Sequence, residues 1–562
     1  MYKIFLILRT VKHLSLVQTF YRIKYIFKRK SLTLLNKIFP FIFSNSPRSF
    51  NFEESDNLPI SIFKPKSSIV EIENDFWVFN FLYDKHKFKK EDLWSEYKAK
   101  NRLWMMTFHY FEWISNLTDE DLTFCLKSWI NDNRPFTQES WHASWNSYSI
   151  SLRSVSWMVE YEKRKNQLDS DDLLLLRNSI LEQLIFLSNN LELDLGGNHL
   201  IKNIKALLWG DKFFDNQISN RFALKANKLL EDELKKQILD DGFHFELSPS
   251  YHLQVFEDLL ECYVLLPDSQ LKLELATKLK KMSSVVTLVS FPDGKVSLLG
   301  DSGFEMSRNS RELLEAYSKI FIKERNLGHA THLHESNYFV FRNHEVNLIY
   351  DAGHIGPSEL PAHSHGDIFS FELCLDGQRI IVDKGVYEYE EGDLRALSRS
   401  TCSHNTLSID GEDQAEFWSS FRVGRRPSVI LNKYRISNDL LEVDAEHDGF
   451  SFLEGAPLHR RVFKFEPTEN YIYISDLIKS GVSHRTTSKL LLHPEVEIIN
   501  VEDYKALLKT GKRTLLIESK QQRISLEKSL WWPNLGQEYS CKELVFLNSD
   551  SRKESQITIK ID

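Results

Sequence analysis

The chain has 562 residues, which is more than a single compact core usually holds, so we expect two domains. Apolar residues make up 42% and charged residues 27% of the chain; these ordinary proportions indicate a soluble globular protein and exclude disorder on a large scale. The formal net charge of −8 argues against a general nucleic-acid-binding protein, although a local basic patch could still hold a polyanion.

The cysteines and the N-terminal residues place few limits on the cellular context. The five cysteines are scattered and form no CxxC pair, so neither a disulfide framework nor a cysteine metal site is indicated. Residues 1–60 are predicted as a helical lead-in that lacks a recognisable secretory signal, and no stretch reaches the roughly 20 apolar residues of a membrane span. Residues 22–30 (RIKYIFKRK) could touch an anionic membrane surface, but we favour an amphipathic helix that packs on its own domain.

Helical patterns dominate the next part of the chain, and we predict a helical domain over residues 75–310. Apolar residues recur at three- and four-residue spacing over 171–191 and 221–239, and glycine turns such as Gly196–Gly197 separate such segments. Successive helix pairs of this length suit a toroid of α-hairpins or a bundle, and periodicity alone does not choose between them.

Strand patterns replace helical ones over residues 330–562, after a turn at 291–294 (FPDG). Asp376–Gly377 predicts a tight hairpin, because this kind of turn favours glycine at positive φ. Short strand-like runs recur between turns: YFVFR, VNLIYD, FSFELCL, RIIVD, LLEVDAE, RVFKF, YIYISD, TLLIES, ELVFL and ITIKI. Their spacing predicts a large β-sandwich, so the expected fold is an α+β multidomain chain with helices first and strands second.

Two polar clusters in the helical part carry side chains suited to catalysis. Asn198 and His199 lie at a break between helices and could donate hydrogen bonds into a cleft, or Asn198 could cap a helix instead. Ser248 and Pro249 predict a helix start just before Tyr251, where the positive end of the helix dipole favours a phenolate. A tyrosine in a first turn can equally be a packing or surface residue.

Histidines and an aspartate in the strand part could bind a metal ion. If residues 363–365 are extended, the imidazoles of His363 and His365 point the same way, since alternate side chains share a face. Asp383 ends one strand-like run and His404 begins another. Two histidines and one aspartate on neighbouring strands suit zinc, while polar residues at strand ends remain an equally open interpretation.

A group of tyrosines and arginines follows directly after Asp383. It contains Tyr387, Arg395 and Arg399. Arginine suits a carboxylate or sulfate through paired hydrogen bonds, so these residues could hold an acidic ligand. An aspartate or glutamate within the fold is an equally open partner for them.

Taken together, these clusters resemble the heparinase II/III family over most of residues 95–480. The stretches that carry the resemblance include GGNHLIKNIKALLWG, DGFHFELSPSYH, FPDGKVSLLGDSG, HSHGDIFSFELCLDGQRIIVDKGVYEY and RSTCSHNTLSIDGEDQAEFW. The resemblance implies an incomplete α/α toroid joined to an antiparallel β-sandwich. It also implies a polysaccharide lyase that cleaves a uronate-containing glycan by β-elimination.

The resemblance assigns catalytic roles to four residues. Asn198 and His199 match the residues that neutralise the uronate carboxylate. Tyr251 matches the catalytic tyrosine, which acts as acid and, for suitable sugars, also as base, and His363 matches the catalytic histidine. Because the C5 hydrogen of a uronate is a very weak acid, polar groups must offset the charge that its loss creates, while a base removes the proton and an acid protonates the departing O4 oxygen.

The resemblance further implies a metal and a substrate-binding surface. His365, Asp383 and His404 match the ligands of a structural divalent metal, with zinc favoured and calcium left open. Tyr387 lies where some family members place another active-site tyrosine. We expect the acidic polysaccharide to contact a set of aromatic and basic side chains: Trp145, Tyr148, Tyr387, Arg395 and Arg399.

The alternative function is a non-catalytic protein that binds an acidic glycan during surface polysaccharide assembly. The combination of Asn198, His199, Tyr251 and His363 favours the enzyme, because a binder needs no base. A metal-dependent hydrolase is disfavoured, since no glycosidase-like carboxylate pair is recognisable. The resemblance places the protein in the periplasm or cell envelope of a bacterium, with the cytoplasm as the alternative location, and leaves the oligomeric state open.

Overall fold

A computed structural model describes residues 2–40, 61–63, 70–73, 76–96, 101–214, 217–322 and 328–562. The chain divides into two compact units. The helical unit contains residues 15–236 and 255–279, and the sheet unit contains residues 1–14, 237–254 and 280–562. Part of the predicted helical lead-in, residues 41–60, lies outside the described residues.

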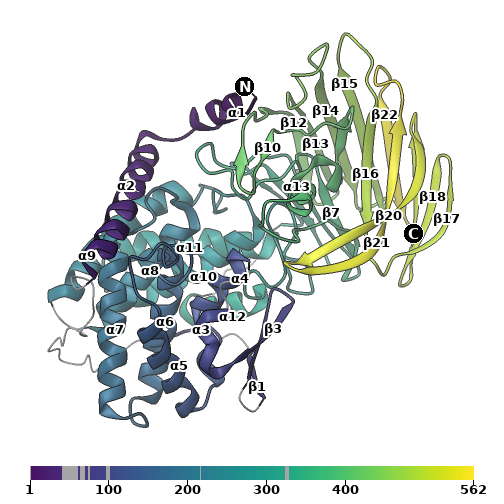
Figure 1. The fold of residues 1–562 in the computed structure, drawn as a ribbon. Coiled ribbons are helices and arrows are strands. Elements are labelled where there is room, and N and C mark those ends of the chain that lie inside the picture. The colour runs from purple at the N-terminus through teal and green to yellow at the C-terminus, as the bar shows by residue number, and fades with distance from the viewer. Residues whose placement is uncertain are drawn as a thin grey trace. The chain divides into compact units, whose positions relative to one another are not determined.

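The helical unit is built from α-hairpins, drawn from purple to teal in Figure 1. Neighbouring helices pack in the pairs α4–α6, α6–α7, α6–α8 and α7–α8. Its helices are α2 (Leu16–Ile38), α3 (Leu93–Glu96), α4 (Arg102–Tyr110), α5 (Asp119–Asp132), α6 (Ser147–Arg164), α7 (Ser170–Asn189), α8 (Gly197–Phe213) and α9 (Gln217–Gln237). Two further helices, α10 (Pro249–Leu265) and α11 (Gln270–Leu288), run through both units. Among the described residues, every helix is too short or too polar to span a bilayer.

Local sequence explains where these helices start. Thr118 is the N-cap of α5, and its side chain accepts a hydrogen bond from the backbone N–H of Asp121 at 3.1 Å. The first turn of α5 also carries acidic side chains, which the positive end of the helix dipole favours. The helices predicted over 171–191 and 221–239 are confirmed as α7 and α9, with bounds shifted by two to four residues at three of the four ends.

One prediction in this unit is wrong: the helical pattern does not begin at residue 75. Instead β1 (Val70–Glu73), β2 (Phe76–Phe81) and β3 (Asp84–Lys89) form a small antiparallel sheet. Leu82 and Tyr83 both have positive φ, which gives the two-residue turn between β2 and β3 the twist that a hairpin needs. The aromatic side chains of β2 pack against α4, so burial on more than one side hides the strand periodicity.

The sheet unit is a β-sandwich with short helices beside it. The helices are α1 (Tyr2–Val11), α12 (Ser310–Ile320) and α13 (Asp393–Arg399). One sheet has the order β12-β13-β14-β15-β22-β19-β18-β17, and the other has the order β20-β21-β16-β8-β7-β6-β5-β4, with β9 paired to β16; β10 and β11 form a separate hairpin. The strand pairings in both sheets are antiparallel, as predicted.

The strands of the sandwich have the following bounds. The first group is β4 (Ala330–Leu333), β5 (Tyr338–Arg342), β6 (Val346–Asp351), β7 (Phe371–Leu375), β8 (Gln378–Ile381), β9 (Leu407–Ile409), β10 (Phe417–Trp418) and β11 (Arg422–Val423). The second group is β12 (Val429–Ser437), β13 (Leu440–His447), β14 (Leu458–Glu466), β15 (Tyr471–Lys479), β16 (Thr486–Leu492) and β17 (Glu497–Glu502). The last group is β18 (Lys505–Thr510), β19 (Arg513–Lys520), β20 (Arg523–Asn534), β21 (Gln537–Asn548) and β22 (Ser555–Ile561).

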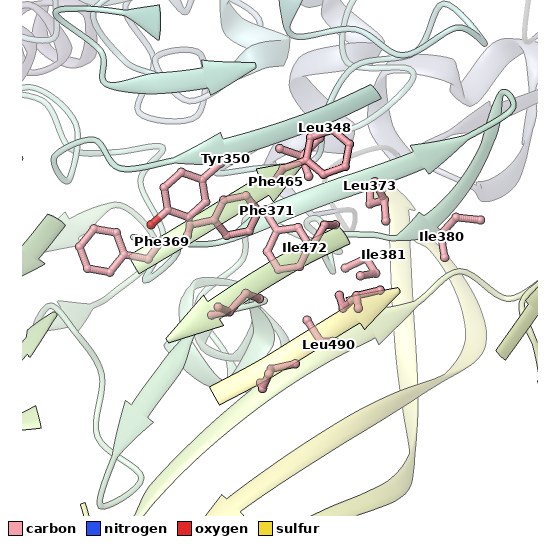
Figure 2. Packing of buried hydrophobic residues seen from close by; sticks show 14 of the residues in the cluster. Leu348, Tyr350, Phe369, Phe371, Leu373, Ile380, Ile381, Phe465, Ile472 and Leu490 are labelled. Carbon is pink, nitrogen blue, oxygen red and sulfur yellow. The ribbon is translucent and has the colours of Figure 1, made fainter. Parts of the chain in front are cut away.

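The core of the sandwich lies between the inner faces of its two sheets. Figure 2 shows Phe371 and Leu373 of β7 close to Phe465 of β14 and Ile472 of β15. Along β14 the side chains alternate between buried and partly exposed, which is the period-two pattern of a strand with one covered face. This alternation in the sequence is what allows the strands to be predicted.

Candidate active site

A stacked tyrosine–histidine pair lies where α10 begins. Pro249 is the first residue of α10, as predicted, and the hydroxyl of Ser248 accepts a hydrogen bond from the Tyr251 backbone N–H at 3.3 Å. The Tyr251 ring stacks on the His363 imidazole, with the ring centroids 3.7 Å apart. The Tyr251 hydroxyl oxygen lies 3.1 Å from that of Tyr389. Groups that can take up and release protons are therefore in contact within the sheet unit.

Carboxylates lie beside both ring nitrogens of His363. Its Nδ1 is 2.9 Å from Oδ2 of Asp301, and its Nε2 is 3.4 Å from Oε2 of Glu246. An ionised carboxylate only accepts hydrogen bonds, so Nδ1 of His363 donates to Asp301. A neutral imidazole in this tautomer keeps its lone pair on Nε2, which makes Nε2 the atom that can accept a proton.

Asp301 is fully buried and bonded to three basic side chains. Arg395 donates to both of its carboxylate oxygens, at 2.9 Å for Oδ2, and Nε2 of His365 lies 2.8 Å from Oδ1. Burial alone would raise the pKa of Asp301, but Arg395 and the histidines hold that pKa well below its usual range. The carboxylate stays ionised, and both ends of the Arg395 guanidinium fork are engaged with it.

The loop that carries Asp301 is held against the His363 backbone. The N–H of Asp301 donates to the His363 carbonyl at 2.9 Å, and the Ser248 hydroxyl donates to the Asp301 carbonyl at 2.8 Å. Gly300 has a φ of +59°, and a Cβ at this position would lie 2.9 Å from the His363 carbonyl oxygen. Glycine is the residue that tolerates both conditions, so Gly300 lets the loop join the start of α10 to His363.

His365 and His404 are buried neighbours whose ring centroids lie 5.3 Å apart. Nδ1 of His404 lies 2.7 Å from Oδ2 of Asp383, just as Nε2 of His365 faces Asp301. Each of these nitrogens donates to a carboxylate, so in the neutral rings that metals bind the lone pairs fall on Nδ1 of His365 and Nε2 of His404. Among the residues that the structure describes, neither of those buried atoms has a hydrogen-bond partner. Histidines that bind metals commonly donate their other nitrogen to a carboxylate in this way.

The two imidazoles fit the predicted metal, whereas Asp383 has other partners. Its Oδ2 accepts from His404 and its Oδ1 accepts from the N–H of Gly385 at 3.1 Å. Within the part of the chain that the structure describes, no group of three or more His, Cys, Asp or Glu side chains is arranged to hold an ion. The set His365, Asp383 and His404 therefore stays a prediction.

Asn198 and His199 lie in the first turn of α8, in the helical unit. The N-cap of α8 is Gly196, so the alternative in which Asn198 caps the helix is wrong. Nδ1 of His199 lies 3.0 Å from Oε1 of Glu192, and the other oxygen of Glu192 accepts from Asn203 at 3.1 Å. Glu192 therefore orients the His199 ring, whose side chain is 32% exposed while Asn198 is buried beside it.

The two aromatic residues predicted to contact substrate have different surroundings. The ring of Tyr148 lies 4.5 Å from that of His199, between centroids, and burial raises its pKa well above the usual range. Trp145 is buried; its indole N–H donates to the Asn133 carbonyl at 3.0 Å and its ring packs on Phe186. Tyr148 is thus brought to His199, and Trp145 belongs to the core.

Comparison with family models decides the ancestry of the chain. A model described as "Heparinase II/III N-terminus" matches residues 118–329, and a model described as "Heparinase II/III-like, C-terminal" matches residues 325–560. The two matches together run without a gap through both the helical and the strand part. The chain belongs to the heparinase II/III family.

Relatives in this family are named as lyases. A "Heparin-sulfate lyase" of Bacteroides thetaiotaomicron is 26% identical over 329 residues, which are 50% of this chain and 47% of that protein. One of Bacteroides stercoris is 28% identical over 254 residues, which are 39% of this chain and 37% of that protein. The chain matches less than half the length of these relatives.

Solved structures of the family share the fold. A crystal structure of heparinase III superposes with a TM-score of 0.70 at 19% identity, over 83% of this chain and 78% of that one. The heparan sulfate lyase HepC from Pedobacter heparinus gives a TM-score of 0.60 at 19% identity, over 85% and 79%. The predicted fold class, a helical toroid followed by an antiparallel β-sandwich, is confirmed.

One of the two tyrosines that meet at the start of α10, Tyr389, was not predicted as a site residue from the sequence. Tyr389 meets the catalytic candidate Tyr251, whereas the predicted Tyr387 packs its ring on Trp532, 5.7 Å away between centroids. Burial raises the pKa of Tyr389 well above its usual range, so its hydroxyl stays protonated and can donate. Arg399 is buried and donates to backbone carbonyls, including that of Ser364 at 3.1 Å. Substrate binding by Tyr387, Arg395 and Arg399 remains a prediction.

Proposed function

We propose that this protein is a polysaccharide lyase that cleaves a uronate-containing glycan by β-elimination. The observation that carries the proposal is the contact between Tyr251 and His363, two proton-transfer groups stacked on each other beside a second tyrosine hydroxyl. The names of the relatives, heparin-sulfate lyases, suggest a sulfated glucosamine–uronate polymer as the first substrate to examine.

Proton transfer would be shared between the two stacked residues. Asp301 holds the proton on Nδ1 of His363, so Nε2, which lies 3.4 Å from the Glu246 carboxylate, would be the nitrogen that takes the C5 proton. The Tyr251 hydroxyl, next to the donor Tyr389, is suited to give its proton to the departing O4 oxygen, because the Tyr389 hydrogen bond stabilises the phenolate that remains. The products are a new reducing end and a chain that begins with an unsaturated uronate.

Neutralisation of the uronate carboxylate falls to Asn198 and His199 under this proposal. Loss of the C5 proton places a second negative charge on the sugar's acid group, and hydrogen-bond donors at that group lower the barrier. Glu192 fixes the His199 ring through Nδ1, and the proposal assigns Nε2 to the uronate carboxylate. The amide of Asn198 would supply a second donor from the same helical turn.

We also propose that a structural divalent metal binds between His365 and His404. Their partnerless buried nitrogens support this, and Asp301 and Asp383 would fix the two rings. The ion would hold the segment between β6 and β7, which carries His365, and the segment before β9, which carries His404, together. Because His365 shares Asp301 with His363, the metal and the catalytic histidine would depend on the same carboxylate.

A panel of uronate polymers that includes heparan sulfate tests the proposal. The purified protein is incubated with each polymer while the ultraviolet absorbance of the unsaturated product is followed. A rise with at least one polymer is expected. Binding of a polymer without any rise would point to the glycan-binding alternative, and new reducing ends without absorbance would point to hydrolysis; either result would overturn the lyase assignment.

A further inference from the structure

Helix α2 presents an exposed apolar stripe along its whole length. Leu16, Phe20 and Phe27 have 89%, 60% and 67% of their surface exposed. The stripe, which we call the α2 stripe, has members three, four or seven residues apart and therefore on one face of the helix: Leu16, Phe20, Ile23, Phe27, Leu34 and Ile38. A continuous apolar face of this size on a soluble protein marks a surface that binds something.

The opposite face of α2 holds the helix on the helical unit. Tyr25 is buried there, and Lys28 donates to the Asn189 carbonyl at 2.7 Å. Trp141 donates from its indole to the Thr33 hydroxyl at 3.2 Å. Ser15 and Gln18 form a capping box that stabilises the N-terminus of α2 from within the helix itself. The predicted packing of the segment on its own domain thus accounts for only one face.

Positive charge borders the α2 stripe. The exposed side chains of Lys24, Lys30 and Lys37 lie on its two sides. Residues 1–40 contain nine Lys and Arg and no Asp or Glu, while residues 41–562 contain 62 Lys and Arg against 79 Asp and Glu. The basic charge of an otherwise acidic protein is therefore concentrated in its first two helices.

Helix α1 repeats the arrangement in the sheet unit. Ile4, Leu8 and Val11 are exposed at helical spacing. On another face Arg9 donates to Glu416, at 2.8 Å from Nε, and Thr10 accepts from the Trp418 indole N–H at 3.0 Å. Each unit thus carries one amphipathic basic helix fixed to it by polar contacts.

We propose that α2 is a docking surface for a membrane that contains anionic lipids. Its apolar side chains would enter the boundary between headgroups and acyl chains, and the flanking lysines would pair with phosphate groups. Phenylalanines at the centre of the stripe suit this depth, and the helix would lie in the plane of the membrane without crossing it.

A second copy of the chain is a less suitable occupant for the same face. In a two-fold dimer the same patch contacts itself, so the lysines beside the α2 stripe would face those of the partner. Neither α1 nor α2 contains an acidic residue that could balance them. An anionic bilayer supplies both the apolar layer and the opposite charge.

Vesicle binding by the full-length protein tests the proposal. The protein is sedimented with phosphatidylcholine vesicles that either contain or lack phosphatidylglycerol. We expect about tenfold stronger partition onto the anionic vesicles at low ionic strength, and a loss of that advantage at high salt. Equal partition onto both kinds of vesicle, or none onto either, would overturn the proposal.

Matched variants locate the surface. Phe20→Asp combined with Phe27→Asp should lower the partition onto anionic vesicles by about tenfold or more, and Lys24→Glu combined with Lys30→Glu should do the same. Controls come from α9, where Leu224 is 72% exposed and Lys228 is also exposed; Leu224→Asp and Lys228→Glu should bind as the wild type does. Thermal melting checks that each variant is folded.

Light scattering tests whether a second copy of the chain covers the α2 stripe instead of a membrane. The wild type in solution should have a mass that does not depend on the Phe20 and Phe27 substitutions. A dimer that those substitutions dissociate, together with unchanged vesicle binding, would assign the α2 stripe to a second copy and overturn the membrane proposal. Lyase activity on soluble polymer is expected to be the same in all these variants, so the result is independent of the proposed function.

Discussion

Asp301 is the residue on which the proposed proton chemistry depends most. Its two oxygens orient His363 and His365, while Arg395 balances its buried charge. Under the proposed mechanism, a carboxylate in this position selects which nitrogen of His363 acts, and it also links His363 to the predicted metal ligand His365. A single side chain thus positions two functions.

Replacing Tyr251 with phenylalanine should remove turnover and leave glycan binding in place. The Tyr251→Phe variant keeps the ring that stacks on His363 but lacks the hydroxyl that faces Tyr389, so kcat should fall by about a hundredfold or more while KM changes little. Tyr504→Phe, at an exposed turn, serves as the control. Steady-state kinetics measure both, and a Tyr251→Phe enzyme with near-normal kcat would remove that residue from the mechanism.

Replacing Asp301 with asparagine should strongly destabilise the sheet unit. The Asp301→Asn variant leaves the buried Arg395 guanidinium without its counter-charge, and loss of one member of a buried ion pair costs about 3–5 kcal/mol. Denaturant unfolding measures the change. The double variant Asp301→Asn with Arg395→Met should recover part of the loss; an unchanged free energy of unfolding in the single variant would contradict the role given to this pair.

The sequence indicates most of the catalytic candidates but not the groups that hold them. Tyr251 and His363 were predicted separately, and the structure brings them into contact. Asp301, in the LGDSG stretch, was not predicted as a site residue, because a buried aspartate in a glycine-rich turn has no local pattern that distinguishes it from a turn residue. Which of Tyr387 and Tyr389 faces Tyr251 depends on the backbone path of a segment outside the helices and strands. A periodic pattern of apolar residues cannot predict that path.

At the scale of elements, the start of α10 is stabilised by a histidine that must stay neutral. Nδ1 of His252 accepts from the backbone N–H of His244, and its Nε2 faces the Met282 carbonyl at 3.1 Å. Both bonds use the neutral ring, since a protonated ring could no longer accept at Nδ1. Burial lowers the pKa of His252 to about 4.

Stability should therefore fall as the pH drops through the range set by His252. The folded-state pKa lies below the unfolded value of about 6.5, so the contribution is fully present above that pH and is lost progressively towards pH 4, by about 3 kcal/mol. Unfolding in denaturant at several pH values between these limits measures the slope. His252→Gln, which keeps an acceptor and a donor, should flatten the curve; an unchanged slope would contradict this assignment.

Helices and strands could be predicted from the sequence where one face is buried and the other is exposed to solvent. Every strand-like run named from the sequence overlaps a strand, and Asp376–Gly377 makes the predicted turn with positive φ at both positions. The hairpin over residues 76–89 was missed, because three successive positions of β2, Trp77, Val78 and Phe79, are buried and hide the alternation. The observed helix bounds differ from the predicted ones by a few residues, because helix ends fray.

At the scale of the whole molecule, the change of period near residue 330 predicts the helix-then-strand order, and the fold comparison confirms it. The assignment of residues 237–254 to the sheet unit could not be predicted, because local patterns do not report which unit a segment packs on. That assignment matters for function, since it places Tyr251 in the same unit as His363.

A bound divalent metal should contribute to the stability of the sheet unit. Elemental analysis of the purified protein is expected to find about one ion per chain, and a chelator should lower Tm. His404→Ala should lose the ion and melt at a lower temperature, while His334→Ala, at an exposed position, should keep both properties. A wild-type protein without metal, or a His404→Ala variant that retains it, would contradict the metal proposal.

The central claim, cleavage by elimination at a uronate, is tested most directly by following solvent oxygen into the products. The protein is incubated with its best polymer in ¹⁸O-labelled water, and the first products are analysed by mass spectrometry before exchange at the reducing end becomes significant. Elimination predicts an unsaturated terminal uronate and no solvent oxygen in either fragment at the moment of cleavage. Saturated fragments that carry ¹⁸O would show hydrolysis and contradict the account.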